Sequence, residues 1–384
     1  MMSYNILAGG FGTGRPLSWT VDVIEAAEAD VIGIQEGGAL DPMIATALGF
    51  NIQRFSGGTT ILSRYPITEV ISNKGVKIQI SPTQQAYVFD DHLDPYPYQP
   101  YDFRDGVITT EAEAIAAAQT LRGPDTTTLL NSMSAALTSG DPVFLTGDFN
   151  EPSHLDWTQE AADAGLNFSK KVAWPTSTAV TNAGLTDAFR EIRPDEIGDR
   201  GETWTPGYPP PNFPTANEVH DRIDFVYYAG ANVAPVEALL LGYEPNDGNT
   251  DIVVQPYPSD HRALVVEFDF PGCGQAGDVN SDCAINTADW MQFRNGQHSD
   301  MTGFTAAQAY AQGDLNGDFS NNHADFVLFK SSYESAFGAG SFSRLLSVPE
   351  PASAALAMWI GLAGVWPRRL LVRGARRSAA CRLA

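Results

Sequence analysis

Cysteine is scarce in this chain of 384 residues, which contains only three, at Cys273, Cys283 and Cys381. So few cysteines exclude a disulfide-rich scaffold, and their spacing does not match a zinc site. Two interpretations of Cys273 and Cys283 stay open. They form a disulfide if the protein is exported, or they are two ordinary free thiols.

Positive charge is also scarce, because 23 Lys and Arg stand against 46 Asp and Glu and give a net charge of −23. Affinity for nucleic acid comes mainly from Lys and Arg, so this balance disfavours a broad nucleic-acid-binding face. It does not exclude a nuclease, because a bound divalent cation supplies positive charge locally. Hydrophobic residues make up 43% of the chain, which is enough for a large core.

A leader segment is missing as well, because "MMSYNIL" enters a predicted strand without a charged or apolar stretch before it. At the other end, an apolar run at 352–366 is followed by an arginine cluster at 368–377, as in membrane-targeting segments. Such a tail makes sense on an exported chain. We therefore hypothesise that the natural start lies upstream and includes a signal peptide.

Short runs rich in β-branched and aromatic residues, bounded by Gly, Pro, Asp or Asn, predict strands in the first 270 residues. Helical periodicity is clearest at 17–29, 111–122 and 127–138. The mixed connections favour an α/β fold with two packed sheets flanked by helices over one parallel sheet. The predicted strands are 3–7, 30–36, 59–67, 76–80, 86–93, 142–149, 222–228 and 263–270.

Polar residues stand at the borders of these apolar strands, where α/β folds place ligand sites. Capping explains any single case, but not so many at once. Carboxylate and amide oxygens suit Mg²⁺, and a histidine beside carboxylates can activate water. Together they predict metal-assisted hydrolysis of a phosphoester. The residues are Asn5, Glu36, His92, Asp148, Asn150, Asp224, Asp260 and His261.

Six ordered motifs, "SYNIL", "IGIQE", "HLD", "LTGDFNEP", "RIDFVY" and "SDHRALVVEF", resemble the endonuclease/exonuclease/phosphatase superfamily, which has the DNase I-like fold. The resemblance covers about residues 1–270 and implies a four-layer α/β sandwich with its site at one sheet edge. It implies that Glu36 is the principal ligand of Mg²⁺ or Mn²⁺. Asn5 and Asp260 would lie near the same ion.

The same resemblance implies roles for the other strand-end residues. Asp148 and Asn150 would position the nucleophile and the phosphate. Asp224 and His261 would form the pair that activates or orients water. His92 would contact the scissile phosphate or assist the leaving group.

Three further residues are candidates for substrate binding. Arg64 is a phosphate contact by the same resemblance, or an exposed arginine at a strand end. The segment 94–106, "DPYPYQPYDFRDG", is either a rigid surface loop or a wall facing the substrate. In the second case Tyr101 and Arg104 would touch the leaving group.

Residues 278–333 contain two copies of a pattern with the ligand spacing of a calcium loop, each followed by an apolar helix. The pair resembles a type I dockerin, although Cys283 and Phe319 stand where that family has Gly. It implies Ca²⁺ binding and either a cohesin-like protein partner or a calcium-rigidified spacer. The oxygen ligands would be Asp278, Asn280, Asp282, Asn286 and Asp289, then Asp314, Asn316, Asp318, Ser320, Asn322 and Asp325.

The tail, with Pro-Glu-Pro at 349–351 before the apolar run, resembles the PEP-CTERM sorting signal of Gram-negative bacteria. It implies export, a transient membrane anchor, processing by an exosortase-type enzyme, and a surface or secreted location. The predicted organisation is a catalytic domain (1–271), calcium repeats (272–335), a linker (336–347) and a sorting segment (348–377).

The leading hypothesis is an exported, metal-dependent enzyme that hydrolyses a phosphodiester or phosphomonoester. A secreted DNA or RNA nuclease of the same fold is the first alternative. A catalytically silent binding module displayed on the cell surface is an alternative of another class. The sequence contains no pattern that identifies the substrate.

Overall fold

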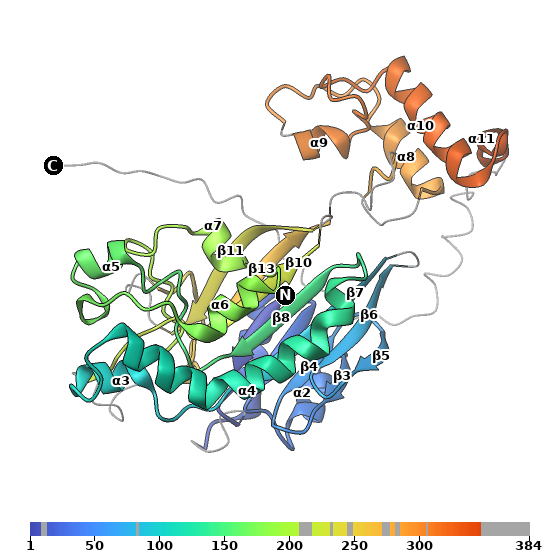
Figure 1. Ribbon diagram of the computed structural model, residues 1–384. Helices are drawn as coiled ribbons and strands as arrows, with labels where there is room; N and C mark the ends of the chain where they lie inside the picture. The colour runs from blue at the N-terminus through green and yellow to red at the C-terminus, as the bar shows by residue number, and fades with distance from the viewer. Residues whose placement is uncertain are drawn as a thin grey trace. The chain divides into compact units, whose positions relative to one another are not determined.

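The computed structural model describes residues 1–8, 14–81, 84–206, 217–230, 233–243, 249–270, 277–280, 285–304 and 306–346 (Figure 1). The chain divides into two compact units, Met1–Phe329 and Lys330–Ala384. Because that division separates neither 1–271 from 272–335 nor the later segments from one another, the predicted domain boundaries stay predictions.

Two β-sheets form the centre of the first unit. The strands of one are β1 (Met2–Asn5), β2 (Val31–Gln35), β3 (Asn51–Arg54), β4 (Thr60–Ser63), β11 (Ala234–Gly242), β12 (Ile252–Val253) and β13 (Ala263–Asp269). Their order is β12-β11-β13-β1-β2-β4-β3. The strands of the other are β5 (Ile67–Ile71), β6 (Gly75–Ser81), β7 (Gln84–His92), β8 (Val143–Asp148), β9 (Thr186–Asp187) and β10 (Asp224–Ala229). Their order is β5-β6-β7-β8-β10-β9.

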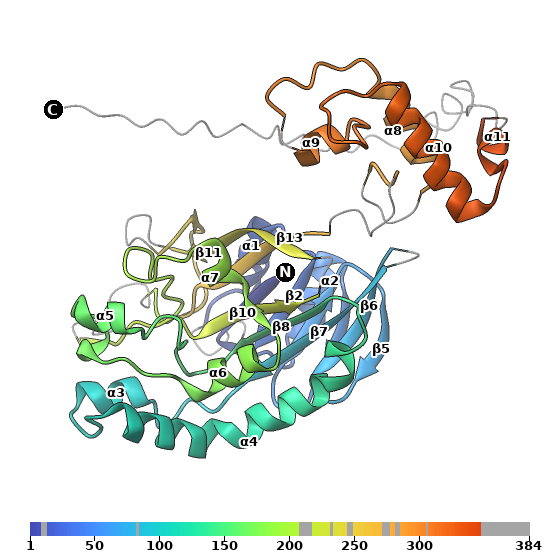
Figure 2. The same ribbon diagram turned by 45° about the horizontal axis from the view of Figure 1, so that its top comes forward.

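Helices cover the outer faces of both sheets (Figure 2). On the first sheet, α1 (Leu17–Ala27) and α2 (Asp41–Leu48) pack through buried apolar residues such as Val23 and Ile44. On the second, α4 (Glu111–Leu137) and α6 (Pro175–Asn182) pack through residues such as Met133 and Val180. Three shorter helices, α3 (Gln99–Arg104), α5 (Gln159–Asp163) and α7 (Ala188–Ile192), lie in the connections. The predicted four-layer sandwich is confirmed.

The interior between the sheets is apolar toward one edge and polar toward the other. Val76, Phe144 and Leu264 belong to the apolar part, which both sheets build. Further along the same faces, Asp90 Oδ1 accepts hydrogen bonds from Gln35 Nε2 at 2.6 Å and Thr146 Oγ1 at 2.8 Å. Buried polar groups need such partners. This polar strip leads to the edge at which β1, β2, β7 and β8 end.

Close approach of the sheets explains the glycine in "VIGIQE". A Cβ atom on Gly33 would lie 1.9 Å from Thr146 Oγ1 and 2.4 Å from Asp90 Oδ1. Real Cβ atoms do not approach other atoms so closely, and the neighbouring atoms belong to the polar strip. Glycine at this position therefore lets the two sheets pack at the distance that brings their polar ends together.

The described residues after 276 form four helices, α8 (Thr287–Asn295), α9 (Ala306–Tyr310) and α10 (His323–Phe337), and beyond the repeats α11 (Ser341–Leu345). A helix follows each predicted calcium loop, as expected, and the buried rings of Phe293 and Phe329 pack with their centroids 5.1 Å apart. Within the predicted linker 336–347, the described residues contain α11, with Phe342 buried, and the linker itself stays a prediction.

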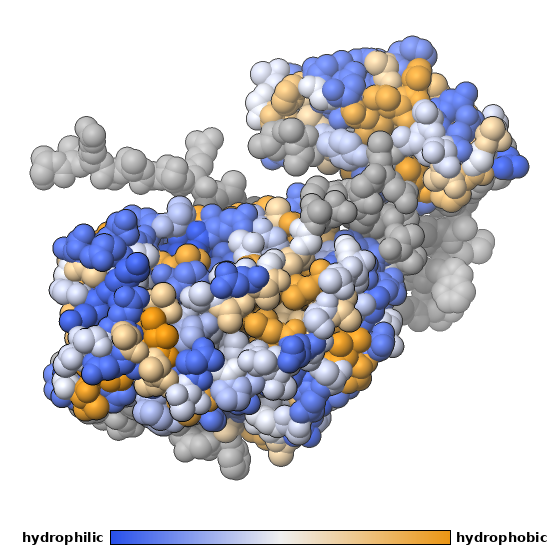
Figure 3. All heavy atoms as spheres, viewed as in Figure 1, coloured by the Kyte–Doolittle hydropathy of each residue, from blue (hydrophilic) through white to orange (hydrophobic). Residues whose placement is uncertain are grey.

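Several sequence predictions fall on residues outside the described part of the chain. They are the pairing of Cys273 with Cys283, the ligand Asp282 and the sorting segment 348–377. Within the described residues, no helix has both the length and the apolar character that crossing a membrane requires. On the face drawn in Figure 3, apolar and hydrophilic residues are interspersed, as on ordinary protein surfaces.

Candidate active site

The polar strand ends meet in one pocket of about 190 Å³. Strands β1, β2, β7 and β8 end at this edge, and β10 begins there because it runs antiparallel to β8, with Asp224 opposite Asp148. The pocket is lined by Glu36, Pro95, Tyr96, Tyr98, Tyr101, Asp148, Asn150, Trp204, Ile223, Asp260 and His261.

Asp148 occupies the centre of the cluster and is buried. Its Oδ2 atom accepts a hydrogen bond from Asn5 Nδ2 at 2.9 Å and lies 3.5 Å from His92 Nε2 and 3.7 Å from His261 Nε2. The same Asn5 nitrogen donates to Glu36 Oε1 at 3.2 Å. Side chains from residue 5 to residue 261 thus surround one carboxylate.

His261 forms a buried pair with Asp224, in which Nδ1 lies 2.8 Å from Asp224 Oδ2. Burial alone would lower the pKa of His261, but the carboxylates of Asp224 and Asp148 outweigh it and raise that pKa to about 10. Burial also raises the pKa of Asp224. The contact with Asp224 leaves Nε2 directed toward Asp148 and the pocket.

The donor set fits a divalent cation. Ligand atoms of Asp148, Asp224 and His261 lie within 4.8 Å of one another. Among the described residues, Oδ1 of Asp224 and Oδ1 of Asp260 are buried without a hydrogen-bond partner. Carboxylate oxygens are ligands of hard cations, and unpaired buried ones are costly unless a charge compensates them. The cluster therefore has both the oxygens and the excess negative charge that such an ion requires.

The predicted metal ligands Glu36 and Asp260 line this pocket, while Asn5 contacts the cluster from behind. Asn5 turns its N–H, not its oxygen, toward the carboxylates, because its Oδ1 accepts from Leu7 N at 3.1 Å. In this arrangement Asn5 bridges two carboxylates. Its role as a direct ligand stays a prediction.

Two site residues have a left-handed backbone, Glu36 with a φ of 53° and Asn150 with a φ of 49°. Asn tolerates this conformation better than Glu, whose side chain gains nothing from it. The Asn150 backbone N–H donates to Asp148 Oδ1 at 2.9 Å, and its Nδ2 donates to Leu93 O at 3.0 Å. These bonds hold the turn after β8 that presents Asp148.

The predicted phosphate contact of Arg64 is wrong. Arg64 follows β4, which runs antiparallel to β2 with Ser63 opposite Val31, so it lies at the start of β2 and not at its Glu36 end. There its Nε donates to Asp30 Oδ1 at 2.6 Å. Arg64 is therefore a surface residue at the opposite edge of the sheet.

Of the two residues predicted from the aromatic segment, only Tyr101 lines the pocket. Arg104 lines a neighbouring cavity of about 630 Å³ and pairs with Asp105 through Nε and Nη2, at 2.8 and 2.9 Å. Arg104 lies over the ring of Tyr101 at 4.5 Å but does not line this pocket, so its contact with a leaving group stays a prediction.

Sequence reasoning missed several residues that shape the pocket, namely Tyr96, Tyr98, Trp204 and Ser259. Tyr96 and Tyr98 belong to the same aromatic run as Tyr101, so the run itself was the available signal. Ser259 precedes the motif "DH"; its Oγ donates to Asn5 O at 2.6 Å and accepts from His261 N at 3.1 Å. Nothing in the sequence around Trp204 distinguishes it.

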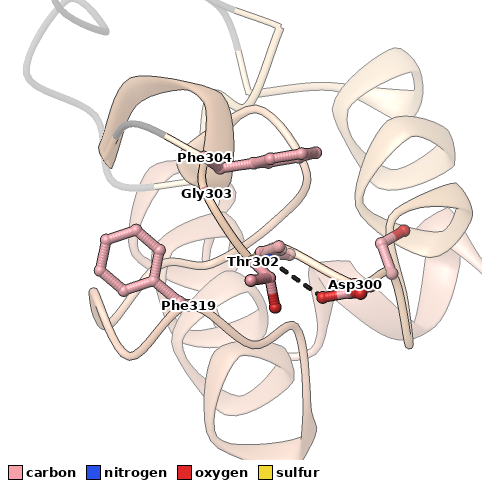
Figure 4. A pocket seen from close by; sticks show the side chains of 7 residues that line it. Asp300, Thr302, Gly303, Phe304 and Phe319 are labelled. Atoms are coloured by element: carbon pink, nitrogen blue, oxygen red, sulfur yellow. Dashed lines mark hydrogen bonds between the residues drawn. The ribbon is translucent and has the colours of Figure 1, made fainter.

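The second calcium-loop copy brings its acidic residues together, because ligand atoms of Asp314, Asp318 and Asp325 lie within 4.8 Å of one another. Phe319, at the position where Gly is expected, has a φ of 61°. It lines a cavity of about 420 Å³ with Phe304, as Figure 4 shows. The first copy is described only in part.

The chain is similar in sequence to known proteins. A family model described as the Endonuclease/Exonuclease/phosphatase family matches residues 2–261. The uncharacterized protein F14F9.5 of Caenorhabditis elegans is 31% identical over 224 residues, which are 55% of this chain and 70% of that protein.

Similar solved structures include an endonuclease/exonuclease/phosphatase from Beutenbergia cavernae, 16% identical, with a TM-score of 0.43 over 71% of each chain. An AP endonuclease from Archaeoglobus fulgidus is 14% identical, with a TM-score of 0.44 over 70% of this chain and 98% of its own. The human Nocturnin catalytic domain, with a bound sulfate, is 16% identical, with a TM-score of 0.41 over 70% and 92%.

Proposed function

Because the chain belongs to the endonuclease/exonuclease/phosphatase family, we propose that it is a divalent-metal-dependent phosphoesterase whose active site is the pocket around Asp148. One observation carries the proposal. Glu36, Asp148 and the Asp224–His261 pair come from four separate segments of the chain and meet in one pocket where strands of both sheets end or begin.

We assign the roles from the contacts and from the lining of the pocket. Glu36, Asp148 and Asp260 would hold the Mg²⁺ or Mn²⁺ ion, with Asn5 bridging Glu36 and Asp148. When bound, the ion would neutralise these carboxylates, polarise the phosphoryl group and, through its charge, lower the pKa of His261.

The remaining groups handle the proton and the phosphate. Asp224 keeps Nδ1 of His261 protonated, so Nε2 is the atom that accepts a proton from the attacking water. His92, whose Nε2 lies 3.5 Å from Asp148 Oδ2, donates to a phosphate oxygen or to the leaving group. Asn150 positions the phosphate from the turn after β8.

The test is an activity screen of the full chain with Mg²⁺ on a generic phosphodiester, a phosphomonoester and plasmid DNA. We expect hydrolysis of at least one of them, and its loss in both Glu36→Ala and His261→Ala. Arg64→Ala is the matched control, because Arg64 lies at the opposite sheet edge, and it should keep wild-type turnover. Turnover that survives both site changes would refute the site, and preference for plasmid DNA would favour the nuclease alternative.

For the repeats we propose Ca²⁺ binding by the two loops. The proposal is supported by the ligand spacing and, in the second copy, by three converging aspartates. Asp325 also supports the loop, since its Oδ1 accepts from Leu315 N and Asn316 N at 2.8 and 3.1 Å. A cohesin-like partner is proposed on the dockerin resemblance alone.

Export, exosortase-type processing and display at the cell surface are proposed from the tail at 348–377. Expression of the gene with its upstream sequence, followed by fractionation of the cells, tests this proposal. A protein that stays in the cytoplasm with an intact tail would contradict it.

A further inference from the structure

The catalytic pocket has two chemically different sides. Glu36, Asp148 and His261 belong to the polar side described above. The other side consists of Pro95, Ile223 and the rings of Tyr96, Tyr98, Tyr101 and Trp204. Among the described residues that line the pocket, none is Lys or Arg, so beyond the catalytic cluster these residues offer apolar surface and no cation.

Hydrogen bonds hold the rings by their polar ends. The hydroxyl of Tyr98 donates to Asp221 Oδ2 at 2.6 Å, and Asp221 Oδ1 accepts from Trp157 Nε1 at 3.0 Å. The hydroxyl of Tyr101 donates to Glu218 Oε1 at 2.5 Å, and the same oxygen accepts from Trp204 Nε1 at 3.3 Å. Because carboxylates take these polar ends, Tyr98, Tyr101 and Trp204 offer a ligand mainly ring surface.

A fully buried arginine, Arg122, holds the segment that carries these tyrosines in place. Arg122 donates through Nε to Asp94 O at 2.9 Å and through Nη1 to Gln99 Oε1 at 2.7 Å. Its Nη2 lies 3.4 Å from the carbonyl oxygens of Pro95 and Pro97. Because the segment is held at so many points, its rings have one arrangement. Binding a ligand there therefore costs little conformational entropy.

Two rings are placed to touch a group bonded to the phosphate. The ring of Trp204 packs beside His261 with 5.0 Å between centroids. Tyr96 lines the same pocket although 67% of its surface is exposed. A ring carried by a phosphoester in this pocket can therefore contact Trp204 and Tyr96, because both line it.

We propose that this aromatic side is a subsite for a planar, uncharged ring carried by the substrate, next to its single phosphate. The inference rests on the proposed phosphoesterase function and names its substrate class, a small ring-bearing phosphoester and not a polymeric nucleic acid. The volume of about 190 Å³ supports this choice, since pockets for larger organic ligands measure about 300 Å³ or more. A polyanion would need cations that the described lining does not provide.

Equilibrium binding to the full chain with Mg²⁺ tests the subsite apart from turnover. The probes are phenylphosphonate and methylphosphonate, which share the phosphonate group and differ in the ring. We expect phenylphosphonate to bind about tenfold more tightly, which is within the range of aromatic stacking. Tyr96→Ala should remove much of that preference, and Tyr96→Phe should retain it.

Phe168→Ala is the matched control, because Phe168 is an exposed ring that lines the neighbouring cavity and not this pocket. It should keep the full preference. Equal affinities for the two probes, no binding of either, or an unchanged preference in Tyr96→Ala would each overturn the subsite. The subsite would also be overturned if a short oligonucleotide bound more tightly than phenylphosphonate, with a steep dependence of its affinity on salt. Hydrolysis without ring preference overturns only the subsite, and ring preference without hydrolysis of any ester overturns the proposed function.

Discussion

His261 lies buried between two carboxylates, and its contacts decide which of its nitrogens can react. Asp224 faces Nδ1 at 2.8 Å, while Nε2 faces Asp148 and the pocket. A carboxylate can only accept a hydrogen bond, so Asp224 requires a proton on Nδ1 and leaves Nε2 for chemistry. At the scale of the residue, the contacts therefore fix one tautomer of His261, the one with its proton on Nδ1.

We predict that Asp224→Asn lowers kcat by roughly 10²- to 10⁴-fold, because an amide N–H directed at Nδ1 favours the wrong tautomer. Steady-state kinetics on whichever phosphoester the wild type hydrolyses measures the effect. Asp30→Asn is the control, since that carboxylate pairs with Arg64 at the opposite edge. A kcat within about twofold of wild type in Asp224→Asn would contradict the assignment.

The sequence predicts the reacting groups of this site better than its walls. Glu36, Asp148 and His261 are recognisable because each stands at the border of an apolar strand, which is a local signal. Trp204 carries no such signal, because its place beside His261 depends on the fold of distant segments. Arg64 misleads for the same reason, since only strand pairing shows at which edge a strand ends.

At the scale of the element, strand pairing and packing override local preference. The segment of β11, "APVEALLLG", contains good helix formers and was not predicted as a strand, yet it pairs with β13 from Ala234 to Leu241. The helix α4 was predicted as two helices, but it continues through Pro124. Its first half packs through Ala118 and its second through Met133, so burial on both sides of the proline keeps it continuous.

Contact between the two sheets gives a second prediction. Gly33→Ala should lower the free energy of unfolding by about 3 kcal/mol, because the added Cβ overlaps the buried side chains of Thr146 and Asp90. Gly38→Ala is the matched control, since a Cβ there meets nothing within 4 Å. Chemical denaturation of both variants measures the difference, and equal midpoints would refute the proposed close contact.

At the scale of the whole molecule, buried carboxyl groups link stability to pH. Burial raises the pKa of Glu151 and that of Asp221, each to about 7. The nearest cation to Glu151 is Arg122, at 3.8 Å between Oε2 and Nη1. In the unfolded chain such groups ionise near pH 4, so the folded state holds protons that the unfolded state releases.

The contribution of these two carboxyl groups to the free energy of unfolding should therefore fall as pH rises from about 4.5 to 7 and level off above 7. Glu151 alone accounts for up to about 3 kcal/mol of this fall. We expect Glu151→Gln to reduce the difference in stability between pH 5 and pH 8 by that amount. Glu69→Gln, on an exposed strand position, should not change it. Denaturant unfolding at the two pH values measures both variants, and equal pH dependence would contradict the prediction.

Calcium supplies a prediction for the repeat region. If each repeat binds one ion, Ca²⁺ should raise the free energy of unfolding of this region by about 3 kcal/mol at a hundredfold excess over Kd. Asp325→Asn should abolish binding to the second loop and leave the first. Asp300→Asn is the control, because Asp300 lies outside both loops. Calorimetric titration counts the ions, and unchanged binding in Asp325→Asn would rule out the second site.

The left-handed backbone at Glu36 has an evolutionary consequence. Glycine adopts that conformation without strain, whereas glutamate costs on the order of 1 kcal/mol there. A lineage under pressure for heat resistance alone would drift from glutamate to glycine at this position. We therefore expect glycine at this position in relatives that have lost turnover.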